Sequence, residues 1–210
     1  RRHQKLIEET PPPGIPTDLL DRLAKSSCNA LAKLKYSSAG TLEFLFQNDT
    51  FHFIEMNTRI QVEHPITEVV TGIDLVKLQV SFASSGKLLL KQEDIRFNGH
   101  AMECRINAED AEFQPAPGLV RDYIVPGGPG VRLDSHLYAG YDVPHQYDSL
   151  LAKVITNGKD RNECIVRMKG ALGELVIRPL PTNIGLQKSI LDDVRFMSGD
   201  LNTNFLNVKK

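Results

Sequence analysis

Residues 55–65 concentrate chemically active side chains in one short stretch of the chain. Two carboxylates, Glu55 and Glu63, flank an amide at Asn57 and a guanidinium at Arg59, and a histidine and a proline follow. A segment that only filled a core would not carry so much charge, because buried charges are costly unless they are paired. The composition therefore indicates a metal and phosphate site joined to a site for an oxyanion and for proton transfer.

The two strands that lead into this stretch determine which carboxylates meet. Apolar and polar residues alternate over Thr41–Gln47 and Phe51–Asn57. A two-residue turn would pair Glu43 with Ile54, whereas a three-residue turn over 48–50 would pair Glu43 with Glu55. The longer turn also gathers the apolar residues of both strands on one face, so we predict the three-residue turn.

Two glutamates directly opposite each other in a hairpin repel and destabilise the sheet. A divalent cation between Glu43 and Glu55 would remove this repulsion, and their hard oxygen ligands suit Mg²⁺ or Mn²⁺ carried with a nucleotide phosphate. Two solvated glutamates on an exposed sheet face are the alternative interpretation.

Arg59 and Glu63 lie just beyond these carboxylates, on a stretch that has no strand periodicity. An arginine fork matches a carboxylate, a bicarbonate or a phosphate, and a glutamate beside it could act as a general base. An ordinary surface ion pair, which contributes little to stability, is the alternative.

A further candidate cation, Arg105, stands inside an otherwise apolar strand pattern. A buried arginine needs a partner. We therefore expect Arg105 to pair with Glu103 or Glu109, or to bind an anionic ligand.

The remaining patterns predict an α+β protein. A helix capped by Thr17 or Asp18 is expected to end just before Tyr36, and Asp74 is expected to cap a helix that runs through Ala83, with Gly86 as its stop. Further helices are expected at 66–71, at 160–175 and at 182–191. Strands are expected at 99–107, 119–125, 131–133 and 150–156. We place a domain boundary in the polar connection at 86–96, which gives domains of residues 1–90 and 91–210.

Composition narrows the class of protein. The 210 residues are 41% hydrophobic and 24% charged, as in an ordinary globular protein, and the net charge of -1 gives no support for nucleic-acid binding. No apolar run is long enough to span a membrane, and we expect no signal peptide from the charged opening residues. Three scattered cysteines argue against a disulfide framework and for a reducing compartment, so we expect a cytoplasmic protein. The chain opens without Met, and we expect it to be part of a longer protein.

Residues 55–68 closely resemble the signature of biotin carboxylases, the ATP-dependent component of biotin-dependent carboxylases. Four further segments match the same family in order, at 1–5, 40–46, 103–110 and 147–153. The resemblance covers essentially the whole chain. It implies the C-terminal half of an ATP-grasp domain, an antiparallel sheet with helices, followed by the α+β C-terminal domain of this family.

The resemblance also implies a role for each matching residue. The metal ions of MgATP are expected at Glu43, Glu55 and Asn57. The nucleotide is expected to contact His3 and, through adenine, Leu45. Bicarbonate and carboxyphosphate are expected at Lys5, Arg59, Gln61 and the backbone of Val62. Glu63 resembles the base that deprotonates bicarbonate, and Arg105 resembles the cation that stabilises the biotin enolate. Positioned cations of this kind carry most of the catalysis in phosphoryl transfer.

Members of this family carboxylate biotin on a carrier protein. The implied partners are a biotin carboxyl carrier protein or domain, a carboxyltransferase, the missing N-terminal half of the enzyme and a second copy in a homodimer. Pro129 stands where some relatives carry an aromatic residue near their dimer interface. Acetyl-CoA is the default acyl acceptor, with pyruvate or another acyl-CoA as alternatives.

The glycine-rich lid and the first domain of the family precede the region that matches. We therefore expect the isolated chain to bind ATP weakly and not to hydrolyse it. Two other functions remain open. One is an ATP-grasp ligase of the carbamoyl-phosphate or amino-acid type, which the residues 61–65 disfavour, and the other is a truncated module without catalytic activity.

Overall fold

The computed structural model describes residues 4–206, which form two compact units. One unit comprises residues 12–96, and we call it the hairpin unit. The other joins the segment that ends at Pro11 to the chain from Phe97 onward, and we call it the sheet unit. None of the helices among residues 4–206 combines the length and the apolar character needed to cross a membrane.

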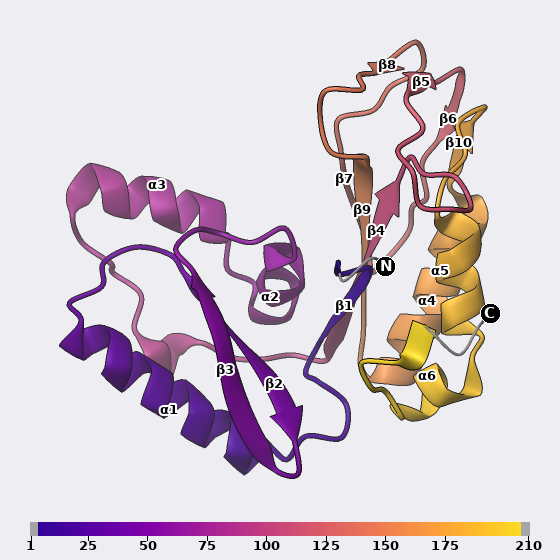
Figure 1. Ribbon diagram of the computed structural model, residues 1–210. Coiled ribbons are helices and arrows are strands. Elements are labelled where there is room, and N and C mark those ends of the chain that lie inside the picture. Colours follow the sequence, from indigo (N-terminus) through magenta and orange to yellow (C-terminus); the bar gives the residue numbers. More distant parts are fainter. Residues whose placement is uncertain (1–3, 207–210) are drawn as a thin grey trace. The chain divides into compact units, whose positions relative to one another are not determined.

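The hairpin unit is built from three helices around a two-stranded antiparallel ribbon (Figure 1). Its elements are α1 (Thr17–Lys33), β2 (Thr41–Gln47), β3 (Thr50–Asn57), α2 (His64–Thr71), α3 (Leu75–Ser85) and the short 3-10 helix η1 (Gln92–Asp94). The expected helix signals operate in α3, because Asp74 Oδ1 accepts from Lys77 N at 2.7 Å and Gly86 ends the helix in the left-handed conformation. The N-cap of α1 is Pro16, with no side-chain cap, so the expected capping by Thr17 or Asp18 is wrong.

The β2–β3 turn is shorter than expected, yet the expected pairing holds. Gln47 pairs with Thr50, so the turn has two residues, Asn48 and Asp49, both with positive φ. The prediction of a three-residue turn is therefore wrong. A bulge next to Phe44 restores the register: Phe44 pairs with Phe53, but Glu43 pairs with Glu55. The extra residue of the bulge changes which face of β3 each later side chain occupies.

The sheet unit contains a four-stranded antiparallel sheet in the order β1-β4-β9-β7. Its strands are β1 (Ile7–Thr10), β4 (His100–Asn107), β9 (Leu150–Gly158) and β7 (Val131–Ser135). Two small ribbons complete the β-structure, β5 (Gly118–Leu119) with β8 (Asp142–Val143) and β6 (Asp122–Ile124) with β10 (Val176–Arg178). The strands β1, β8 and β10 lie outside the strand patterns predicted from the sequence.

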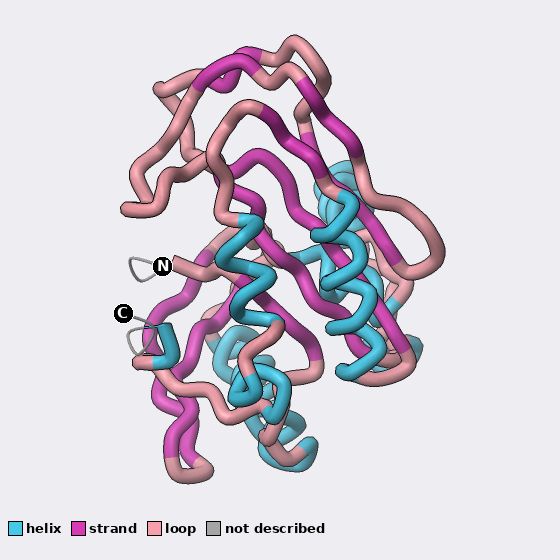
Figure 2. Tube along the Cα trace, turned by 90° about the vertical axis from the view of Figure 1, so that its right-hand side faces the viewer, coloured by secondary structure: helices cyan, strands magenta, loops and turns pink. Residues whose placement is uncertain are grey.

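Helices cover one face of this sheet, as the turned view shows (Figure 2). They are α4 (Arg161–Glu174), α5 (Ile184–Leu191) and α6 (Val194–Ser198). Buried side chains of alternate strand positions, such as Cys104, Ile106 and Val154, share one apolar core with Met168 and Leu172 of α4. Because strand side chains alternate between faces, Arg105 and its neighbours at odd positions of β4 lie on the opposite face.

Candidate functional site

Four oxygen-bearing side chains converge at the end of the β2–β3 hairpin. Asn57 Nδ2 donates to Glu43 Oε1 and to Glu55 Oε1, in both cases at 3.1 Å. Gln61 Nε2 donates to the same Oε1 of Glu43 at 2.8 Å. The two carboxylates that face each other across the strands are thus bridged by the Asn57 amide, which relieves part of their repulsion without removing their charge.

This geometry meets the requirements of a hard divalent cation. Glu43 and Glu55 each direct a carboxylate oxygen to one point, and rotation of the Asn57 amide about its last bond would present Oδ1 there in place of Nδ2. Two carboxylates and an amide oxygen are ligands that Mg²⁺ and Mn²⁺ accept. The donor set therefore fits the metal that the resemblance implies. Leu45, a half-exposed side chain on the same face of β2 as Glu43, lies next to it.

The stretch after β3 places an exposed arginine and a half-buried glutamate before a helix start. Arg59 Nη1 donates to its neighbour Ile60 O at 3.1 Å, and its side chain is exposed. Glu63 is the N-cap residue of α2 and does not cap it with its side chain. His64 Nδ1 lies 2.7 Å from Gln61 O, so the first residue of α2 holds the backbone of the segment that carries Gln61 and Val62. His64, for which sequence reasoning named no role of its own, is thus a support of this segment.

On the sheet unit, Arg105 lies in a row of charged side chains on the face opposite the helices. Arg105 pairs with Lys153 of β9, and Lys153 pairs with Asp134 of β7. Lys153 Nζ lies 3.5 Å from Asp134 Oδ2. Burial raises the pKa of Asp134, but the hydrogen bond and charge of Arg132 together with the charge of Lys153 outweigh it and hold this pKa below its ordinary value.

Arg105 forms an ion pair that sequence reasoning did not name. Its Nε lies 2.6 Å from Oε1 of Glu8 in β1. The expected pairing of Arg105 with Glu103 or Glu109 stays a prediction. Glu109 accepts from Ser149 Oγ at 2.6 Å and from Asn107 Nδ2 at 3.2 Å. Because Glu8 and Arg105 lie on strands that are distant in the chain, no local pattern in the sequence indicates their pairing.

The predicted site residues are divided between the hairpin unit and the sheet unit. Lys5 is exposed and precedes β1 in the sheet unit, and His3 lies outside the described residues. Glu43, Glu55, Asn57 and Gln61 are brought together by hydrogen bonds in the hairpin unit. Val62 and Glu63 follow Gln61 directly in the chain.

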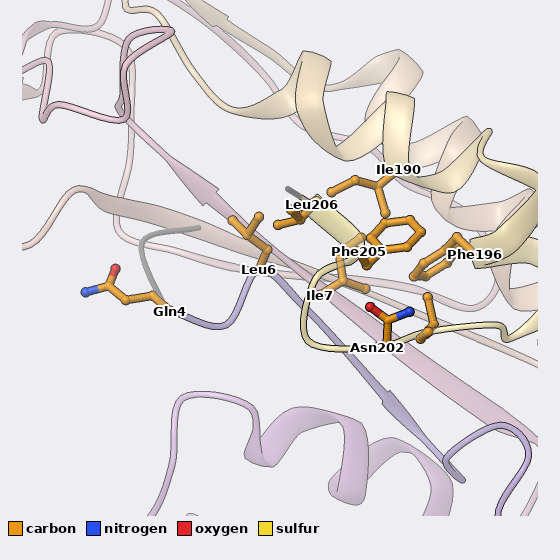
Figure 3. A pocket seen from close by; sticks show the side chains of 9 residues that line it. Gln4, Leu6, Ile7, Ile190, Phe196, Asn202, Phe205 and Leu206 are labelled. Carbon is orange, nitrogen blue, oxygen red and sulfur yellow. The ribbon is translucent and has the colours of Figure 1, made fainter. Parts of the chain in front are cut away.

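The sheet unit also contains a hollow of about 220 Å³, whose lining differs from these charged and polar site residues (Figure 3). Its lining is apolar apart from two amide side chains, and consists of Gln4, Leu6, Ile7, Ile190, Phe196, Leu201, Asn202, Phe205 and Leu206. A nucleotide or bicarbonate needs charged partners. The described lining is therefore unlike that of an anion site, and none of the predicted site residues within residues 4–206 belongs to it.

The comparisons with known proteins define first a class and then a family. Residues 1–91 match the family described as carbamoyl-phosphate synthase L chain, ATP binding domain, which places the first part of the chain among ATP-binding domains of ligases. Residues 103–208 match the biotin carboxylase C-terminal domain. The chain belongs to the biotin carboxylase family.

A bacterial relative agrees with this assignment over the whole chain. The chain is 51% identical to a biotin carboxylase of Pseudomonas aeruginosa over 210 residues, which are 100% of this chain and 47% of that protein. The chain thus spans about half the length of the curated relatives it matches.

Two solved structures confirm the α+β fold. The biotin carboxylase domain of the 2-oxoglutarate carboxylase of Hydrogenobacter thermophilus, in complex with MgADP, ADP and bicarbonate, matches with a TM-score of 0.95 and 41% identity. The biotin carboxylase component of a pyruvate carboxylase matches with a TM-score of 0.96, also at 41% identity. Each match covers 99% of this chain and 47% of the other chain. The expected fold class, the C-terminal half of an ATP-grasp domain followed by the C-terminal domain of a biotin carboxylase, is confirmed.

Proposed function

We propose that the chain forms the metal-binding and bicarbonate-binding half of a biotin carboxylase. The full-length protein would carboxylate biotin on a carrier protein, using ATP and bicarbonate, through carboxyphosphate. The convergence of Glu43, Glu55 and Asn57 carries the proposal, because opposed carboxylates bridged by an amide are a costly arrangement in a hairpin that has no cation to bind.

Each residue of the hairpin end has a proposed task. Glu43, Glu55 and Asn57 would hold Mg²⁺ or Mn²⁺, which when bound neutralises charge on the phosphates of ATP. Gln61 would link this group to the bicarbonate site. Its side-chain amide contacts Glu43, and its backbone oxygen contacts His64, which holds the segment that carries Gln61 and Val62. Leu45 and His3 would contact the nucleotide.

The second group of residues would handle bicarbonate and biotin. Arg59, Lys5, Gln61 and the backbone of Val62 would bind bicarbonate and carboxyphosphate. Glu63 would take the proton from bicarbonate, so that the bicarbonate oxygen attacks the γ-phosphorus and ADP leaves. Arg105 would stabilise the enolate oxygen of biotin while its ureido nitrogen is carboxylated.

The related structure with MgADP and bicarbonate supports these ligands at the level of the family. We propose a biotin carboxyl carrier protein or domain, a carboxyltransferase, the N-terminal half of the enzyme and a second copy as partners, in the cytoplasm. We propose domains of 1–90 and 91–210. Acetyl-CoA is our proposed acceptor, and pyruvate is the alternative that the likeness to a pyruvate carboxylase favours.

The test is ATP hydrolysis that depends on biotin and bicarbonate, measured on the full-length protein. Glu63→Gln removes the proposed base and Arg105→Ala removes the proposed enolate partner, and we expect each to lower kcat by about 100-fold or more. Glu112→Gln, an exposed loop position, is the matched control and should keep the wild-type rate. Wild-type rates in both site variants would remove the site assignment.

A further inference from the structure

Both backbone groups of Arg105, the N–H and the carbonyl, form hydrogen bonds with other segments. Its N–H donates to Leu6 O at 3.0 Å. Its carbonyl accepts from Asn183 Nδ2 at 2.9 Å and from Gln187 Nε2 at 3.0 Å. Both amides are buried, and Gln187 Nε2 also donates to Leu6 O at 3.0 Å.

Asn183 forms hydrogen bonds with the part of β4 that lies beyond the start of β1, which begins at Ile7 opposite Cys104. Besides its bond to the Arg105 carbonyl, its Oδ1 accepts from Asn107 N at 2.9 Å, and its own N–H donates to Asn107 O at 3.2 Å. The side-chain amide thus occupies the place of a neighbouring strand for the peptide groups around Arg105. With the main chain held in this way, the remaining freedom of Arg105 lies in its long side chain.

Glu8 restricts that freedom. The Glu8 side chain is 8% exposed, and its Oε1 contacts Nε, the inner edge of the Arg105 guanidinium, at 2.6 Å. A carboxylate on the Nε edge leaves at least one outer nitrogen of the planar fork directed away from it. The Arg105 side chain is itself only 18% exposed, so its orientation is set by a short, mostly buried ion pair.

We infer that Glu8 is a positioning residue of the carboxylation reaction, which aims the Arg105 guanidinium at the oxygen of the biotin enolate. The inference rests on the proposed function, because it gives Arg105 that task. Glu8 also offsets the positive charge of two cations, Arg105 and Lys153, which stand directly beside each other on β4 and β9. Without Glu8 the arginine would be repelled by Lys153 and would lose its fixed direction.

The chain offers a matched control in the next residue. Glu9 lies on the same strand, on the opposite face, and is also buried and paired with an arginine, with Oε2 2.7 Å from Arg161 Nε. The carboxylate of Glu9 contacts His100 and Arg161 rather than Arg105 or Lys153. A loss that came only from removing a buried carboxylate of β1 would therefore appear in Glu9→Gln as well as in Glu8→Gln.

The experiment is a double-mutant cycle of Glu8→Gln and Arg105→Ala in the full-length protein, with biotin-dependent ATP hydrolysis as the readout. We expect Glu8→Gln to lower kcat by about 10- to 100-fold, since a displacement of about 1 Å can cost about 100-fold. The KM for MgATP should stay unchanged, and Glu8→Asp should restore part of the rate. Glu9→Gln should keep the wild-type rate at a temperature at which thermal unfolding shows that this variant is folded. In the Arg105→Ala background, Glu8→Gln should have no further effect.

The possible outcomes distinguish the site assignment from the positioning role. A wild-type rate for Arg105→Ala overturns the task that the proposed function gives to Arg105, and with it the positioning role. If Arg105→Ala is slow, three results overturn the positioning role alone. They are a wild-type rate for Glu8→Gln, multiplicative effects of the two changes on kcat in the cycle, and a loss of kcat in Glu9→Gln equal to that in Glu8→Gln. If Glu8→Gln does not fold, as thermal unfolding would show, Glu8→Asp takes its place in the cycle, where a shortened carboxylate should lower kcat only while Arg105 is present.

Discussion

Glu43 lies directly opposite Glu55 across the hairpin because a bulge compensates for the two-residue turn. The two carboxylates share one hydrogen-bond donor, Asn57 Nδ2, and this arrangement keeps two negative charges together on a partly solvated face. A bound divalent cation would lower the free energy of this arrangement, because it would be attracted by both carboxylates at once.

Removing one of the two carboxylates should have opposite effects with and without metal. In Glu55→Gln, the Kd for Mn²⁺ in the presence of ATP should rise at least about tenfold, since a contact to a charged group contributes about 1.5–3 kcal/mol. Without metal, the same variant should be as stable as the wild type or more stable by about 0.2–1 kcal/mol, because a like-charge pair is relieved. A titration followed by electron paramagnetic resonance measures the Kd for Mn²⁺, and thermal unfolding measures the stability without metal. A loss of stability without metal would contradict the opposed-charge interpretation.

Acid should weaken the sheet unit through Glu9. Burial raises the pKa of Glu9, but hydrogen bonds from His100 and Arg161 and their charges outweigh it, so the pKa lies below its ordinary value of 4.5. A carboxyl with a lowered pKa in the folded state stabilises the fold above its unfolded pKa, and this contribution disappears as the pH falls through the folded value.

The corresponding measurement is the free energy of unfolding from pH 7 down to pH 3. Glu9→Gln should cost about 3–5 kcal/mol at neutral pH, because Arg161 is left without its carboxylate partner. The difference from the wild type should shrink below about pH 4.5. The exposed variant Glu112→Gln serves as the control, and a constant difference across this range would contradict the role of Glu9.

The three cysteines should differ sharply in reactivity. Burial raises the pKa of Cys104 well above its ordinary value and that of Cys164 to about 11, whereas Cys28 is exposed on α1. Since the thiolate is the reactive form, a native protein at pH 7.5 should be alkylated at Cys28 alone and at all three positions in denaturant. Mass spectrometry of iodoacetamide-treated protein measures this. Rapid native labelling of Cys104 would show that the sheet core opens.

Gly99 should tolerate no side chain. It has φ +69°, and a Cβ there would collide with the carbonyl oxygen of Gly158, at the end of β9 where that strand pairs with His100. The left-handed conformation alone costs a residue with a Cβ about 1–2 kcal/mol. Gly99→Ala should therefore lower the free energy of unfolding by more than this, as measured in urea, while Gly170→Ala in α4, where a Cβ meets open space, should not destabilise the protein.

Residues 1–210 by themselves should bind MgATP weakly and not hydrolyse it, since the chain spans about half the length of its curated relatives. Isothermal titration calorimetry of the isolated chain checks the first part, and a phosphate-release assay checks the second. Micromolar affinity for MgATP would contradict this expectation.

Local patterns in the chain were enough to predict most of its secondary structure, whereas the chemistry of the candidate site stays a prediction. Three signals depend only on neighbours within one or two turns or strand repeats. They are the spacing of residues 55–65, the helix signals at Asp74 and Gly86, and the apolar patterns of β4 and β9. The expected meeting of Glu43 and Glu55 holds, but the three-residue turn from which it was argued is wrong, and a bulge restores the pairing.

How the two glutamates meet, and what holds Arg105, became known only from the folded chain. The bulge in the hairpin arises from a balance between a turn with two left-handed residues and the packing of Phe44 against Phe51 and Phe53, and no residue type announces it. The pair of Glu8 and Arg105 depends on β1 joining β4, two strands that are separated in the chain by the whole hairpin unit. Pairing between distant strands is specified by the packing of the whole sheet unit, so its partners become known only when the sheet is assembled.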